Sequence, residues 1–207
     1  MQIPLRTRST AETYIEKREW RDAHLPSCPL HPLGGCSFAR HGTYQRLPPR
    51  GLRIARWYCR DSHRTFSLLP DFLAARLPGL LASIEDSITV ASSLKSMEAA
   101  ADAVRGHDIT LPGAVRWLRR RVRAVHAGLE AVGRMLPIGR LSPDTAWRNV
   151  HQQGRVLCEL RQSLSSQILN CTPAPLGFLP TRWARRPRDG DQHSMWPDGP
   201  FATATVG

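Results

Sequence analysis

Two kinds of hydrophobic pattern follow one another along this chain. Between residues 40 and 59, apolar and polar side chains tend to alternate, which is the period of a strand. We expect strands at residues 40–46 and 52–59, joined by the turn-forming sequence LPPRG at residues 47–51. Before them, we expect only a short helix within residues 11–23. The N-terminal part is therefore predicted to contain a small β hairpin.

After Phe66 the apolar residues recur every three or four positions, which predicts helices. The expected helices cover residues 78–91, 97–105, 111–136 and 143–170. Ser96 and Gly106 stand at the cap positions of the second of these helices. The third has the longest apolar stripe, formed by Leu111, Val115, Leu118, Val122, Val125, Leu129, Val132 and Leu136. A helical part thus follows the hairpin.

Residues 171–207 have no such pattern. Prolines, glycines and the basic run RWARRPR at residues 182–188 dominate this segment. That composition is typical of a disordered tail, which could add nonspecific contacts to phosphates.

Positive charge is in large excess. The chain has 29 Lys and Arg against 17 Asp and Glu, a formal net charge of +12, and Lys17 and Lys95 are its only lysines. Arginine binds phosphate groups through paired hydrogen bonds and stacks on nucleic-acid bases. The excess therefore favours a nucleic-acid partner.

The sequence contains no sign of a membrane segment or a leader. Its longest apolar stretches are too short to span a bilayer, and residues 1–17 are too polar for a signal peptide. We therefore expect a cytoplasmic protein with no membrane partner. In a reducing cytoplasm, clustered cysteines favour a bound metal over disulfides.

Two clusters of metal-type side chains flank the hairpin. Cys28, His31 and Cys36 precede it, and Cys59 and His63 follow its second strand. A zinc ribbon holds one Zn²⁺ between two such turns, with four Cys or His side chains in tetrahedral arrangement. The sequence therefore predicts one zinc ion per chain.

Five candidates compete for the four ligand positions. The expected ligands are Cys28, Cys36, Cys59 and His63. The pair Gly34-Gly35 lets the backbone turn sharply before Cys36, and a thiolate is a strong zinc ligand. The alternate ligand is His31 in place of Cys36, because His31 has the ordinary C-x2 spacing from Cys28.

Residues 96–136 have the outline of a helix-turn-helix, with a short alanine-rich helix, a turn and a longer arginine-rich helix. In that motif the second helix enters the major groove of DNA. The candidate DNA contacts are Arg116, Arg119, Arg120 and Arg123, which lie off the apolar stripe, and Arg53 and Arg56 in the second strand. The alternative for the helix is a solvated basic face on a helix bundle.

Four short motifs give the chain a family resemblance. The sequences CPLHPLGGC, RHGTY, RWYC and HRTFSLLPDF resemble the N-terminal zinc-ribbon region of bacterial insertion-sequence transposases and related uncharacterised proteins. In that family a CPxCG knuckle, an HGxYxR strand, an RYRC strand and a CGRTFS turn precede a helix-turn-helix. Cys28 and Cys59 match the family's first and third ligand positions. The resemblance implies zinc binding and DNA binding by a mobile-element protein.

We therefore expect a mainly α protein with a small β zinc ribbon. The expected organisation is an N-terminal segment at 1–24, a zinc-ribbon hairpin at 25–72, a helical domain at 73–170 with the helix-turn-helix-like unit at 96–136, and a disordered basic tail at 171–207. No triad of carboxylates on strands is found to hold two Mg²⁺ ions, so we expect no catalytic residues.

The expected function is non-catalytic binding of duplex DNA by a protein related to or derived from a transposase. Two alternatives stay open. One is a helical protein-interaction module whose helices form a bundle or a homodimer. The other is the DNA-binding subunit of a split transposase.

Overall fold

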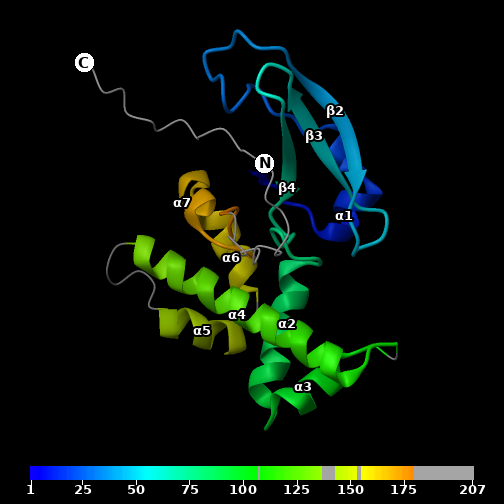
Figure 1. The fold of residues 1–207 in the computed structure, drawn as a ribbon, viewed down its shortest axis with the longest axis vertical. Coiled ribbons are helices and arrows are strands. Elements are labelled where there is room, and N and C mark those ends of the chain that lie inside the picture. Colours follow the sequence, from blue (N-terminus) through cyan, green and yellow to red (C-terminus); the bar gives the residue numbers. More distant parts are fainter. Residues whose placement is uncertain (107, 137–142, 153–154, 180–207) are drawn as a thin grey trace, which may run out of the picture.

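The computed structural model describes residues 1–106, 108–136, 143–152 and 155–179. A four-stranded mixed sheet occupies one end of the molecule, and most of the helices occupy the other (Figure 1). The strands are β1 (Gln2–Leu5), β2 (Phe38–Gln45), β3 (Arg53–Cys59) and β4 (Arg64–Pro70), in the order β1-β4-β3-β2. β1 pairs parallel to β4, whereas the other two pairings are antiparallel.

The prediction of a small zinc-ribbon hairpin followed by helices is wrong as a description of the fold. The hairpin of β2 and β3 exists, but it forms only half of the sheet. The strand β1 was not predicted, since it has only four residues and pairs with a strand more than sixty residues away, as in the pair Gln2 and Ser67. The strand β4 was not predicted either, because Leu68 and Leu69 are both buried and so break the alternation expected of a half-exposed strand.

The two faces of the sheet contribute to different cores. On one face, Ala55, Trp57 and Cys59 of β3 join Phe66 and Leu68 of β4 in a small core. On the other face, Ile54 of β3 and Leu69 of β4 join a larger core. Because successive side chains of a strand point to opposite faces, neighbouring residues of β3 enter different environments.

The larger core also contains most of the helical part. The helices of this part are α2 (Leu81–Ser93), α3 (Met97–Val104), α4 (Leu111–Met135), α5 (Pro143–Gln152), α6 (Val156–Ser163) and α7 (Ser166–Cys171). The short helix α1 (Ala11–Glu16) and the 3₁₀ turn η1 (Glu19–Arg21) add Tyr14 and Trp20 to it. Val125, Leu129 and Val132 of α4 are buried in this core, as the apolar stripe predicts.

The helices α2 to α4 follow the sequence prediction closely. Ser96 caps α3, and its hydroxyl accepts a hydrogen bond from the amide of Ala99 at 3.1 Å. The helix predicted over residues 143–170 is instead divided into α5, α6 and α7. Arg155, just before α6, has a left-handed backbone with φ of 63°, and Ser165 caps α7. A left-handed residue cannot continue a right-handed helix, so the chain changes direction there.

The predicted disorder of residues 171–207 is wrong for the described part of that segment. Leu176 and Phe178 are buried in the larger core, and the guanidinium carbon of Arg161 lies 4.4 Å from the centre of the Phe178 ring. The amide of Phe178 donates to the carbonyl of Leu169 at 2.8 Å. The basic run at 182–188 lies outside the described residues.

No membrane span is found among the described helices, because none combines sufficient length with sufficient apolarity.

A buried carboxyl group joins α2 to α6. Glu85 is 1% exposed, and its Oε1 accepts a hydrogen bond from the amide of Leu157 at 2.5 Å. Its other oxygen has no partner among the described residues. Burial is the main cause that raises the pKa of Glu85 to about 7, although the bond from Leu157 acts in the opposite direction. The carboxyl group is therefore mostly protonated in the folded protein below neutral pH.

We predict that Glu85→Gln removes a pH dependence of stability. Between the unfolded pKa near 4.5 and the folded pKa near 7, the unfolded state binds fewer protons than the folded state. Stability of the parent therefore falls as pH rises through this window, by about 3 kcal/mol in all, and is flat above it. Urea unfolding should show that the free energy of unfolding of Glu85→Gln, relative to that of the parent, is higher at pH 8 than at pH 5. The control is Glu98→Gln on the surface, and parallel profiles for parent and Glu85→Gln would contradict the assignment.

Candidate metal centre

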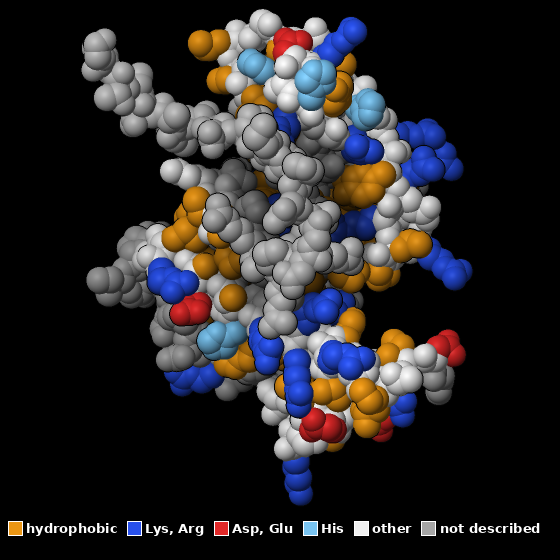
Figure 2. Space-filling model, in the orientation of Figure 1, with side chains coloured by type: hydrophobic (Ala, Val, Ile, Leu, Met, Phe, Trp, Pro, Cys, Tyr) orange, Lys and Arg blue, Asp and Glu red, His pale blue; other side chains and the backbone are white. Residues whose placement is uncertain are grey.

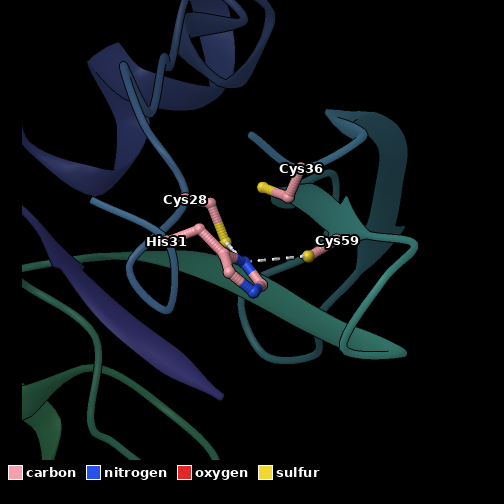
Figure 3. A group of neighbouring side chains, drawn as sticks. All are labelled: Cys28, His31, Cys36 and Cys59. Carbon is pink, nitrogen blue, oxygen red and sulfur yellow. Dashed lines mark hydrogen bonds between the residues drawn. The ribbon is translucent and has the colours of Figure 1, made fainter. Parts of the chain in front are cut away.

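The first two candidate ligands lie in one tight turn before β2. Cys28 and His31 form an isolated β-bridge, and the amide of His31 donates to the carbonyl of Cys28 at 3.1 Å. This turn places both side chains on the same side of the chain (Figure 3). The C-x2-H spacing therefore works as a knuckle, with a histidine where the ordinary motif has a cysteine.

A second turn returns the chain to the same place. Gly34 and Gly35 have φ of 85° and 82°, a conformation that costs a glycine little and any other residue much more. Cys36 follows them and begins the approach to β2, while Cys59 ends β3 on the neighbouring strand. The amide of Arg60 donates to the carbonyl of Ser37 at 3.2 Å and so holds the two segments together.

The four side chains converge on one point. The ligand atoms of Cys28, His31, Cys36 and Cys59 all lie within 4.8 Å of one another (Figure 3). His31 Nδ1 is 3.4 Å from the sulfur of Cys28 and 3.5 Å from that of Cys59. Tetrahedral zinc with Zn–S near 2.3 Å and Zn–N near 2.0 Å places sulfur and nitrogen ligands about 3.5 Å apart. The observed distances fit that geometry.

The electrostatics of the group favour a cation. Cys28 and Cys59 are buried, whereas His31 and Cys36 are half-buried. Burial, followed by the neighbouring sulfurs of Cys28 and Cys59, raises the pKa of the Cys36 thiol. Three thiolates at such short distances repel one another, and a divalent ion would remove this repulsion while replacing their protons. Three sulfurs and one imidazole nitrogen are a donor set that suits zinc.

His63, one of the predicted ligands, does not belong to this group. Its Nδ1 lies 3.1 Å from the hydroxyl of Tyr58, and its backbone φ is 49°. Tyr58 and Cys59 are consecutive in β3 and therefore face opposite sides of the sheet. His63 thus lies on the opposite face from the thiol of Cys59, and we revise the candidate ligand set to Cys28, His31, Cys36 and Cys59.

The sequence contained the signals for this correction. His31 has the usual knuckle spacing from Cys28, although it was expected only as a substitute for Cys36. The structure brings both residues to the group, because the C-x2 turn and the double-glycine turn act in succession. The alternation of β3 gives a reason to exclude His63, since the turn after Cys59 leads back toward the Tyr58 side.

The predicted DNA contacts fall in two places. Arg116, Arg119, Arg120 and Arg123 are exposed on α4, and together with Arg76 they line one cleft with a volume of about 520 Å³. Figure 2 shows Lys and Arg side chains gathered over the region of α4. Arg53 and Arg56 of β3 point to opposite faces of the sheet, so they do not form one surface. Arg76 had no signal in the helical pattern, because it precedes α2 in a turn with φ of 57°.

Comparison with protein-family models, curated proteins and solved structures found no match to this chain. The structure itself shows a group of Cys and His side chains that lie close enough to hold a metal ion. That the metal is zinc and that the partner is a nucleic acid are proposals.

We predict that His31→Ala abolishes zinc binding and that His63→Ala does not. Structural zinc contributes on the order of 10 kcal/mol of apparent binding free energy in small modules, so loss of a true ligand should release the ion and loosen the small core. The purified proteins should contain close to zero and close to one zinc per chain, respectively, by atomic spectroscopy. Cys36→Ser should behave like His31→Ala.

His63→Ala is the matched control, because it removes the same side chain from a position only four residues after Cys59. Retention of zinc in His31→Ala would restore the original assignment. A parent protein that is folded and free of metal would remove the zinc hypothesis.

Proposed function

We propose that this chain is a non-catalytic DNA-binding protein whose N-terminal sheet is supported by one zinc ion. The observation that carries the proposal is the cleft on α4. Its charged lining residues are five arginines, with no carboxylate among the described residues that line it. A cleft lined by one sign of charge concentrates ligands of the opposite sign.

The arginines of α4 form a single row. Arg116, Arg119, Arg120 and Arg123 follow the spacing i, i+3, i+4 and i+7, which places them on one face of a helix. Arg76 approaches the same cleft from the turn before α2, and its guanidinium donates to the carbonyl of Phe178 at 3.1 Å. Two segments separated by about forty residues thus present their charges to one place.

Arg116, Arg119 and Arg123 of this row are available to a ligand. In the described part of the chain, no hydrogen bond or ion pair is found for the side chains of Arg116 and Arg123. Arg119 pairs with Glu98 at 3.0 Å, and both side chains are about half exposed, so that pair is weak and easily exchanged for a phosphate. The apolar residues Leu77, Ala124 and Ala127 line the cleft together with the arginines.

The packing of α3 on α4 supports the predicted helix-turn-helix-like unit. Ala100 and Ala101 of α3 contact Ala114, Val115 and Leu118 of α4 in a separate small core. Small side chains in α3 let the two helices approach closely. The apolar stripe of α4 is therefore used for packing, while the arginine row faces the cleft. The proposed relation to transposases rests on the sequence motifs alone.

We predict that Arg116→Ala and Arg123→Ala each weaken binding to duplex DNA of any sequence. A residue that neutralises one phosphate contributes about 1 to the slope of log K against log salt, so each variant should lower the slope by about that amount. Fluorescence anisotropy with a labelled 20-base-pair duplex at several salt concentrations measures both quantities.

The matched control is Arg134→Ala, which removes an exposed arginine from the far end of the same helix, where it pairs with Glu130 at 3.3 Å. It should change neither affinity nor slope. An unchanged slope in both cleft variants, or an equal loss in Arg134→Ala, would favour the helical protein-interaction module over DNA binding.

A further inference from the structure

One face of the sheet is only partly covered by the helices. Ile54 and Leu69 on this face are buried in the larger core. Farther along the same face, Arg56 and Tyr58 of β3 and Thr65 of β4 are half-buried, although they belong to the two central strands of the sheet. We call the surface formed by Arg56, Tyr58, Thr65 and His41 the open sheet face.

Aromatic side chains on the open sheet face are held in place by one another. The ring of Tyr58 lies 5.3 Å from that of His41, and its hydroxyl lies 3.1 Å from His63 Nδ1. The guanidinium carbon of Arg56 lies 5.8 Å from the centre of the Tyr44 ring. Rings that are fixed before a ligand arrives lose little conformational entropy when a planar group stacks on them.

The acidic and basic residues of the strands are of one sign. The strands β1 to β4 contain no Asp or Glu, and their four charged residues are Arg40, Arg53, Arg56 and Arg64. Arg40 is used internally, because it donates to the carbonyl of Arg21 at 2.6 Å. Arg56 lies on the open sheet face, whereas Arg64 pairs with Cys59 and points to the opposite face.

We propose that the open sheet face binds single-stranded nucleic acid. An arginine beside fixed aromatic rings matches a chain that alternates phosphates with planar bases, as in proteins that bind single strands by stacking. The phosphates of a duplex could contact Arg56, but its bases are stacked inside the helix and could not stack on the ring of Tyr58. This surface is separate from the duplex site proposed on α4, and the two bindings are independently testable.

The test uses the full chain with zinc and a labelled 20-nucleotide thymidine strand. Tyr58→Leu keeps an apolar side chain of similar bulk but removes the stacking surface, and should weaken binding by about 5- to 150-fold. Tyr58→Phe keeps the ring and should stay within about twofold of the parent. Neither variant should change affinity for the 20-base-pair duplex.

A second pair of variants tests the charge. Arg56→Ala should lower the salt slope for the single strand by about 0.7. Arg53→Ala is the matched control, because Arg53 lies three residues away in the same strand but points to the opposite face. It should leave the slope unchanged. Equal effects of the two substitutions would overturn the assignment to this face.

Photocrosslinking of the unaltered protein keeps the inference testable even where a variant fails to fold. A strand containing 5-iodouracil should crosslink to peptides that contain Tyr58 or His41. No single-strand binding by the parent, equal losses in Tyr58→Phe and Tyr58→Leu, or crosslinks confined to α4 would overturn the proposal. If Arg116→Ala and Arg123→Ala leave duplex binding intact while the Tyr58 variants behave as expected, only the function proposed for the α4 cleft is lost.

Discussion

The alternation of side chains along β3 is the constraint on which the metal group and the open sheet face both depend. Trp57 and Cys59 point to one face, where the thiol meets the metal group, and Arg56 and Tyr58 point to the other, where they form the open sheet face. A shift of pairing by one residue would exchange the two sets, so that a cysteine faced solvent and a tyrosine faced the ligands. The antiparallel partners β2 and β4 fix this register from both sides.

The metal group closes a core that is small by itself. Only seven buried residues form that cluster, Cys28 and Cys59 among them. The loop from Cys28 to Cys36 contains two left-handed glycines and has no regular secondary structure to hold it. The four ligands come together only in the folded chain, so the free energy of zinc binding would stabilise the folded state where apolar burial is limited. The same ion would fix the end of β3 and therefore the position of Tyr58, one residue before Cys59.

Local signals made part of this fold predictable, and distant pairings explain most of what was missed. The cap at Ser96, the apolar stripe of α4 and the β2–β3 hairpin are set by neighbouring residues. β1 becomes a strand only because β4 lies beside it, and Phe178 is ordered only because the helical core accepts its ring. Cys28, Cys36 and Cys59 of the grouped ligands were expected from the sequence, and His31 was the alternate ligand. His63 was misplaced because ligand spacing was considered without the strand's two faces.

Arginines of α4 show how packing assigns different roles to one residue type. Arg121 is 6% exposed, lies 3.7 Å from the centre of the Trp117 ring and donates to the carbonyl of Pro78 at 3.1 Å. Burial is the first cause that lowers its pKa to about 10. This contact holds the turn that carries Arg76 against α4, so Arg121 builds the cleft that Arg116 and Arg123 line. Five like charges gathered in this way repel one another in the free protein. A bound polyanion relieves that repulsion, so binding at the cleft should also stabilise the contact between the turn and α4.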